Sequence, residues 1–326
     1  AIDPRNGDLL AMSSQPDFDP NAFLSTDRAE VQRTVVDLSE FNNAISGAYP
    51  PGSTFKPIVG LAALSEGRVR PDDSVFCPGH FEIGGRTFLC WDHKGHKRGS
   101  WLMGLALSCD VYFYTTGLKV GGAAIERYAR AFGLGQKTNI PLKYEKGGHL
   151  FGPETRKKTS KGWYDGDTLN LAIGQGELTV TPLQMAIATA ALANRGSVWR
   201  PRYTQKIVYA DGRPDFVPKP ERLGVVPAKE DAWDEVQRAM QVVITSGTGG
   251  GARIPGLIVA GKTGTAQNPH GEDHAWFIVY AARPGEPASI AISVLVENGG
   301  HGGTTAAPVA RRMILAHFGM MDPAAP

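Results

Sequence analysis

A serine and a lysine lie one helical turn apart at the start of an apolar helical pattern. Ser53-Thr54-Phe55-Lys56 opens a segment whose apolar residues recur at spacings of three and four as far as Gly67. This spacing brings the hydroxyl and the amine to one helix face, within reach of a hydrogen bond. Serine is a weak nucleophile until a neighbouring base takes its proton, and a neutral lysine can be that base. The pair predicts nucleophilic catalysis, although a capping serine beside a solvated lysine gives the same letters.

Two other short motifs carry groups that such a site would need. Lys262-Thr263-Gly264-Thr265 follows a β-rich run and sets a cation and two hydroxyls beside a glycine, which suits an extended anionic peptide. Ser108-Cys109-Asp110 offers a second hydroxyl and a carboxylate inside a helical pattern. Each motif alone is weak evidence, because a strand-to-turn junction and an ordinary helix explain them equally well.

The elements that must position these residues can be read from periodicity and turn chemistry. An Asn6-Gly7 hairpin is predicted to start a sheet edge. Five helices are predicted, at Gly52–Gly67, Trp101–Leu118, Ala123–Phe132, Pro182–Leu192 and Thr305–Phe318, together with an amphipathic helix at Asp231–Thr245 that glycines end. Three β-rich runs are predicted at Leu257–Gly261, His274–Ala281 and Ala288–Val296. Strands at both ends of the chain predict a sheet assembled from distant segments.

Two segments lack regular periodicity. Residues 68 to 99 are rich in glycine, histidine, cysteine and aspartate, which predicts a loop region held by something other than a core. Residues 144 to 161 are predicted to be a long surface loop. Because Cys77, Cys90 and Cys109 are an odd number, they favour free thiols or a metal over a disulfide framework.

Composition narrows the possible partners. The 34 basic and 32 acidic residues leave a net charge of +2 without a basic stripe, which argues against nucleic acid. The longest apolar stretch, near residues 183 to 193, is too short to span a bilayer. The chain opens without methionine or a signal segment, so we interpret it as a piece of a longer protein.

The three motifs together, in this order, resemble the set Ser-x-x-Lys, Ser-x-Asn and Lys-Thr-Gly that serine β-lactamases and penicillin-binding proteins share. The whole chain resembles the penicillin-binding transpeptidases, also in Tyr49–Pro57, in Gly174-Gln175-Gly176 before Thr179–Pro182, and in Gly261–Ala266. The resemblance implies an α+β fold, an α/β sandwich with an antiparallel central sheet flanked by helices and a mostly helical subdomain. Residues 1 to 326 would form one transpeptidase domain.

The resemblance also implies roles for the site residues. Ser53 would attack the penultimate D-alanine of a peptidoglycan stem peptide with Lys56 as general base, and Ser108 would pass the proton to the leaving D-alanine. Asp110 would orient Lys56 or Ser108, and the sequence leaves both open. Lys262, Thr263 and Thr265 would hold the substrate carboxylate, and Gly264 would belong to the same substrate-binding stretch. The N–H groups of Ser53 and Thr265 would form the oxyanion hole. β-Lactams would acylate Ser53 by the same route.

Within the family, the chain is similar to the elongation-type subgroup. Asp110 stands where many members carry asparagine, and Cys77, Cys90, His96 and Cys109 resemble the ligands of a zinc-containing relative in that subgroup. Three thiolates and one imidazole suit tetrahedral structural zinc. His80, His93 or Asp92 could replace His96, and three idle buried cysteines remain the plain alternative.

Two rival functions share these motifs. A serine β-lactamase would need an activated deacylating water, for which no Glu-x-x-Leu-Asn element is found, and a β-lactam sensor would be acylated once and signal. The resemblance implies an intact protein with a membrane anchor and a non-catalytic domain. It would face the periplasm beside a glycan polymerase and other elongation proteins.

Overall fold

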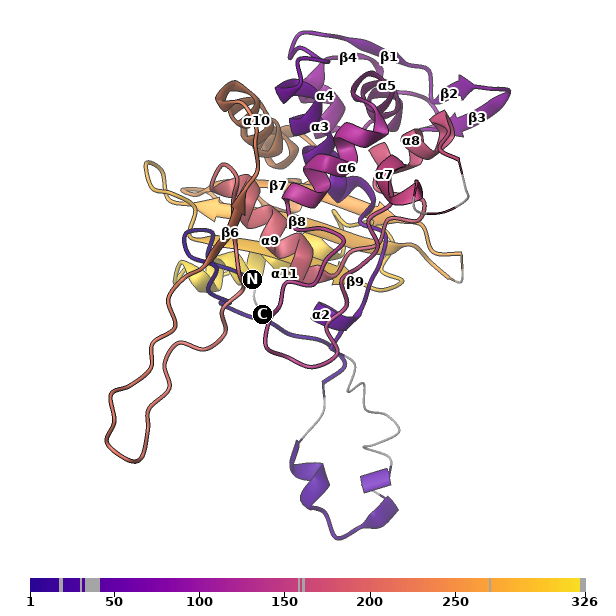
Figure 1. Ribbon diagram of the computed structural model, residues 1–326. Helices are drawn as coiled ribbons and strands as arrows, with labels where there is room; N and C mark the ends of the chain where they lie inside the picture. The colour runs from indigo at the N-terminus through magenta and orange to yellow at the C-terminus, as the bar shows by residue number, and fades with distance from the viewer. Residues whose placement is uncertain are drawn as a thin grey trace.

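The computed structural model describes residues 1–17, 20–29, 31–32, 42–157, 159, 162–269 and 271–322. An antiparallel sheet lies at its centre, with a helical lobe on one side and a C-terminal helix on the other (Figure 1). This arrangement confirms the predicted α/β sandwich with a mostly helical subdomain. Within these ranges, no helix is both long and apolar enough to span a membrane.

The central sheet is built from strands near the C-terminus and is extended by the N-terminus. Its order is β7 (Ile258–Ala266), β8 (His274–Ala282) and β9 (Ile290–Val296), and every neighbouring pair is antiparallel. Ile2 bridges both Leu9 and Ala291, so the predicted Asn6-Gly7 hairpin does lie at the sheet edge. The strand prediction at residues 257 to 261 was too short, because β7 continues through the Lys-Thr-Gly-Thr motif.

Alternation along β8 divides the core into two layers. Ala275, Phe277, Val279 and Ala281 pack in the cluster that includes α11 (Ala306–His317). Trp276, Ile278 and Tyr280 belong to the larger cluster on the helical side. Since both faces are covered, β8 reads as a nearly continuous apolar run, with burial of every residue after His274.

The helical lobe surrounds one fully buried helix. All ten residues of α3 (Lys56–Ser65) are buried, directly after the short 3₁₀ turn η2 (Gly52–Phe55). The other helices are α2 (Asn43–Ser46), α4 (Trp101–Ala106), α5 (Asp110–Val120), α6 (Gly122–Ala131), α7 (Pro153–Arg156), α8 (Asp165–Ala172), α9 (Pro182–Ala193) and α10 (Glu230–Ser246), with 3₁₀ turns η1 (Pro20–Leu24) and η3 (Gly250–Ala252).

The predicted helix at residues 101 to 118 is wrong in its middle. It is broken between α4 and α5, where Ser108 has φ of +57° and Cys109 caps α5 with its sulfur accepting from Tyr112 N–H at 3.4 Å. A left-handed serine is strained in isolation. Lys56 donates to the Ser108 carbonyl at 2.8 Å, so a tertiary contact that no local pattern reveals stabilises the break.

The two segments predicted as loops contain regular structure. In the first, β1 (Val75–Cys77) pairs with β4 (Lys97–Gly99), and β2 (His80–Ile83) pairs with β3 (Arg86–Leu89). In the second, α7 forms, and Glu145, Leu150 and Phe151 are buried, so this segment is not a surface loop throughout. Strands β5 (Ser197–Trp199) and β6 (Arg222–Val225) form a further small pair.

Candidate functional site

Ser53 lies in η2, where the helical lobe meets the edge of β7. Gly52 before it has φ of +53°, and its N–H donates to the Gly174 carbonyl at 2.9 Å. A Cβ atom on Gly52 would lie 2.4 Å from the Thr265 carbonyl oxygen. Glycine is therefore required here for two reasons, its backbone conformation and the close approach of β7, and the contact sets Ser53 beside Thr265.

Lys56 is fully buried one turn after Ser53 and faces the break between α4 and α5. Its Nζ donates to Asp110 Oδ1 at 2.7 Å, to Ser108 O at 2.8 Å and to Ser108 Oγ at 3.2 Å. The second carboxylate oxygen of Asp110 accepts from the Trp91 N–H at 2.9 Å. The sequence left open whether Asp110 orients Lys56 or Ser108. In the structure, the partner of these two that Asp110 bonds is Lys56.

A second buried lysine approaches Ser108 from β7. Lys262 Nζ donates to Ser108 Oγ at 2.9 Å and to the Thr263 carbonyl at 2.8 Å. Burial lowers the pKa of Lys262 well below its usual range, and electrostatic repulsion from the nearby Lys56 amine lowers it further. The Ser108 hydroxyl thus joins two amines that come from distant parts of the chain.

The rest of the Lys-Thr-Gly-Thr motif lines the same edge. Thr263 Oγ1 is 2.6 Å from Thr248 Oγ1, and a Cβ atom on Gly264 would lie 2.7 Å from Thr54 Cγ2. Thr265 is partly exposed, and its carbonyl accepts a long hydrogen bond of 3.4 Å from Gln175. Hydroxyls and a partly exposed strand edge next to a buried amine can bind an extended peptide that ends in a carboxylate.

The predicted active-site residues come together as a set. Lys56, Ser108, Asp110 and Lys262 are joined by hydrogen bonds, while Ser53 and the threonine-glycine stretch meet through the packing of η2 on β7. The arrangement supplies a hydroxyl nucleophile, amines able to move a proton and groups for a carboxylate. These are the components of acyl transfer.

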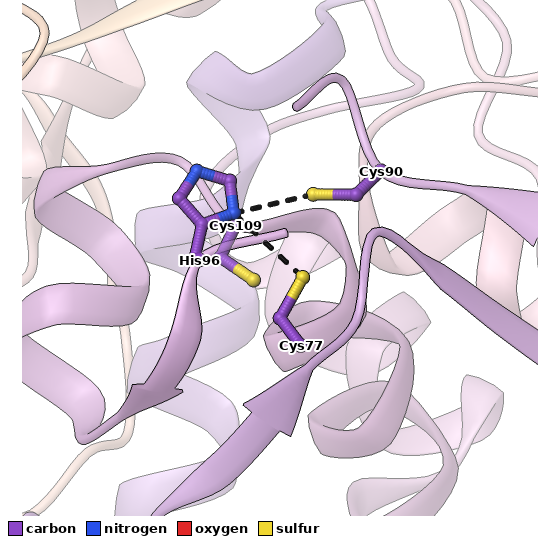
Figure 2. A group of neighbouring side chains, drawn as sticks. All are labelled: Cys77, Cys90, His96 and Cys109. Carbon is purple, nitrogen blue, oxygen red and sulfur yellow. Dashed lines mark hydrogen bonds between the residues drawn. The ribbon is translucent and has the colours of Figure 1, made fainter. Parts of the chain in front are cut away.

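Four side chains with metal-binding donor atoms form a second cluster, which adjoins this site because Cys109 lies between Ser108 and Asp110. Figure 2 shows Cys77, Cys90, His96 and Cys109 pointing toward one another, with all four donor atoms within 4.8 Å of each other. Cys77 ends β1, Cys90 follows β3, His96 precedes β4 and Cys109 caps α5. A cluster that joins these elements fits the prediction that something other than an apolar core holds this segment.

The donor set and its spacing fit a tetrahedral metal. His96 Nδ1 is 3.4 Å from Cys90 Sγ and 3.7 Å from Cys77 Sγ. Zinc bonds of about 2.3 Å to sulfur and about 2.0 Å to nitrogen give a sulfur–nitrogen edge of roughly 3.5 Å at the tetrahedral angle. His80, His93 and Asp92, the predicted alternatives to His96, are not in this cluster within the described ranges. His96 Nε2 is buried on the other side of the ring without a partner in the same ranges.

Sequence reasoning missed two residues that contact the site. Thr248 follows α10 in a glycine-rich stretch that carried no signal beyond ending the helix, yet it bonds Thr263. Trp91 was not selected at all, because a tryptophan within an aperiodic segment has no pattern that places it. Its position directly after Cys90 was the only available signal.

The comparison with protein families gives one match across nearly the whole chain. The model described as the penicillin-binding protein transpeptidase domain matches residues 1–315. The peptidoglycan D,D-transpeptidase MrdA of Acinetobacter baumannii is 37% identical over 94% of this chain and 48% of its own length. MrdA of Haemophilus influenzae is 33% identical over 96% of this chain and 51% of its length. The chain thus spans about half the length of these curated relatives.

Solved structures resemble the fold over the full chain. Penicillin-binding protein 2 of Pseudomonas aeruginosa superposes with a TM-score of 0.84 at 36% identity, covering 100% of this chain and 73% of that one. Penicillin-binding protein A of Mycobacterium tuberculosis, as a ceftriaxone acyl-enzyme, has a TM-score of 0.84 at 27% identity and covers 97% and 72%. A structure on the coordination of polymerization and crosslinking by a peptidoglycan synthase complex has a TM-score of 0.85 at 28% identity, covering 100% and 56%.

Proposed function

The chain belongs to the transpeptidase-domain family of penicillin-binding proteins, and from this membership we propose that it is a serine D,D-transpeptidase of the cell-wall elongation type. Its substrates are peptidoglycan stem peptides, and β-lactams acylate it. The names of the relatives and the acyl-enzyme form of one of them support this assignment. The elongation type is supported by Asp110, which stands where many family members carry asparagine, and by the Cys/His cluster.

The single observation that carries the proposal is the convergence of two lysines on one hydroxyl. Ser108 Oγ lies 3.2 Å from Lys56 Nζ and 2.9 Å from Lys262 Nζ. Lys262 belongs to the strand that lies against Gly52. A proton can move through such a set from the nucleophile to the leaving group without leaving the site.

The proposed reaction proceeds in two acyl transfers. Ser53 Oγ attacks the carbonyl carbon of the penultimate D-alanine as Lys56 takes its proton, and the N–H groups of Ser53 and Thr265 stabilise the oxyanion. The C–N bond then breaks as Ser108 delivers its proton to the departing D-alanine amine and takes the proton held by Lys56 in return, leaving an ester on Ser53. An amine of a second stem peptide attacks this ester and gives up a proton to Lys56. The C–O bond breaks as that proton returns to Ser53 Oγ, which leaves a new peptide bond and restores the serine.

The carboxylate of the donor peptide is assigned to Lys262, Thr263 and Thr265, with Gly264 giving the backbone room to approach. The lowered pKa of Lys262 is compatible with this role, because an incoming carboxylate favours the ammonium form. Asp110 orients Lys56 through the contact of 2.7 Å between them.

We assign structural zinc to Cys77, Cys90, His96 and Cys109. The bound ion would supply charge compensation for the thiolates and hold four segments together, and it would take no part in the acyl transfer. The donor spacing described above supports the assignment.

For the intact protein we propose an anchor in the inner membrane, a transpeptidase domain on the periplasmic side and a glycan polymerase as partner. The likeness to a peptidoglycan synthase complex that coordinates polymerization and crosslinking supports the partner.

Intact-mass spectrometry after incubation with benzylpenicillin tests the function. A persistent adduct of one drug per chain is expected, absent in Ser53→Ala and retained in Ser65→Ala, which removes another serine hydroxyl from the same region. Consumption of the drug without an adduct would instead indicate a β-lactamase. A donor stem peptide supplied with an amine acceptor must then give a cross-linked dimer, since acylation without that product would indicate a sensor.

A further inference from the structure

Trp91 contacts both ends of the turn that carries Ser108. Its backbone N–H donates to Asp110 Oδ2 at 2.9 Å, and its indole N–H donates to the Leu107 carbonyl at 3.0 Å. The residue is 56% exposed, so its main role is not to fill the core. Resting on the proposed function, we propose that Trp91 is a positioning residue that holds Ser108 and Asp110 in register with Lys56 and transmits the order of the Cys/His cluster to them.

The first step of the argument concerns the turn itself. Ser108 has φ of +57°, a conformation that costs roughly 1 to 2 kcal/mol for a residue with a side chain. The Leu107 carbonyl, just past the end of α4, is bonded by the Trp91 indole. Without this bond the turn keeps the Lys56 contact with the Ser108 carbonyl but loses its restraint at Leu107, so we expect the Ser108 hydroxyl to shift relative to the two lysines.

The second step concerns the carboxylate. Asp110 uses one oxygen for Lys56 and the other for Trp91. Two hydrogen bonds on opposite oxygens fix the rotation of the carboxylate plane, whereas one bond would leave it free to turn. The backbone of Trp91 therefore determines where Asp110 holds the Lys56 amine.

The third step links this contact to the cluster. Trp91 directly follows Cys90, and its ring meets the His96 ring edge-on at 5.3 Å between centroids. The segment is also held by the Cys90 N–H on the Gly79 carbonyl at 2.9 Å and by the Tyr114 hydroxyl on the Leu89 carbonyl at 3.0 Å. Cys109, the adjacent neighbour of both Ser108 and Asp110, belongs to the same cluster. Trp91 and Asp110 each follow a cysteine of the cluster, so ordering the cluster fixes both partners of the hydrogen bond between them.

Trp91→Phe tests the indole bond, and Trp199→Phe is its matched control. Trp199 lies in β5, and its indole N–H donates to the Pro4 carbonyl at 3.1 Å. The control variant therefore also loses one hydrogen bond from an indole to a backbone carbonyl, at another place in the fold. The first-order rate constant of acylation by benzylpenicillin, measured by stopped flow, is expected to fall about three- to tenfold in Trp91→Phe and to stay unchanged in the control. A tenfold loss corresponds to about 1.36 kcal/mol, within the range for one hydrogen bond.

Separating the acylation constant from the binding constant distinguishes positioning from other roles. A loss confined to binding would mean that Trp91 contacts the ligand, and it would overturn the proposal. An unchanged acylation constant would do the same. Normalising to the fraction of chains that form an adduct removes any contribution from misfolded protein, and failure of the wild type to acylate would refute the proposed function instead.

A second measurement follows the link to the cluster without using activity. The difference in fluorescence between wild type and Trp91→Phe isolates the emission of Trp91. Chelation of metal, or Cys90→Ser if no metal is found, is expected to change this emission and to slow acylation. Unchanged Trp91 emission after either perturbation would overturn the link.

Discussion

Replacing Asp110 with asparagine alters one atom of the buried carboxylate that holds Lys56. The carboxylate accepts from two donors on opposite oxygens, Lys56 Nζ at 2.7 Å and the Trp91 N–H at 2.9 Å. An asparagine amide has one acceptor oxygen and one NH₂ group. Whichever way the amide is turned, its NH₂ group faces a donor, so one of the two hydrogen bonds is lost.

The expected magnitude follows from these contacts. A hydrogen bond to a charged group contributes about 1.5 to 3 kcal/mol, and about 1.36 kcal/mol corresponds to a tenfold change in rate. Acylation of Asp110→Asn is therefore expected to be about ten- to a hundredfold slower than that of the wild type. Lys56 keeps its bonds to Ser108, so the loss of stability should stay below the roughly 3 to 5 kcal/mol that a broken buried pair costs.

The assay is stopped-flow acylation by a fluorescent penicillin, with the adduct-forming fraction measured by intact mass and stability by thermal unfolding. Asp8→Asn is the control, because Asp8 also pairs with a cation, Arg202, at 2.8 Å, but at the N-terminal hairpin. It should lower the unfolding temperature without slowing acylation. An acylation constant within twofold of the wild type for Asp110→Asn would refute the assignment of Asp110 to Lys56.

Three further predictions test other parts of the site. Gly52→Ala should abolish measurable acylation and destabilise the fold by about 2 kcal/mol or more, because a Cβ atom would lie 2.4 Å from the Thr265 carbonyl oxygen at a residue with positive φ. The control is Gly224→Ala, where a Cβ atom would meet open space, and it should change neither acylation nor stability. The pKa of Lys262 is lowered when the site is free and rises beside a bound carboxylate. Penicillin binding should therefore take up a proton, and the binding should weaken as pH rises through the pKa of Lys262 in the complex. The binding constant of Lys262→Met should not show this pH dependence. Metal analysis should find one zinc per chain, and Cys77→Ser should lose it and lower the unfolding temperature, whereas a metal-free wild type would contradict the site.

Much of the fold could be predicted from the sequence because its elements leave local periodic traces. The buried strands β8 and β9 read as apolar runs, and α10 reads as an amphipathic helix ended by glycine. The short pairs β1–β4 and β2–β3 could not be predicted, because strands of three or four residues are too short to establish a period. The break in the predicted helix at residues 101 to 118 was also invisible, since its stabilising donor lies on α3.

The sequence by itself determined the chemistry of the site. The spacing of Ser53 and Lys56 predicted that they share a helix face. The resemblance of the three motifs to the penicillin-binding transpeptidases predicted a nucleophile, two lysines and a carboxylate-binding strand. Only the tertiary structure decided how these groups meet. It places Asp110 against Lys56, His96 rather than His80, His93 or Asp92 beside the three cysteines, and Trp91 against the turn that carries Ser108. Such contacts depend on how separate elements pack, and packing leaves no period in the chain.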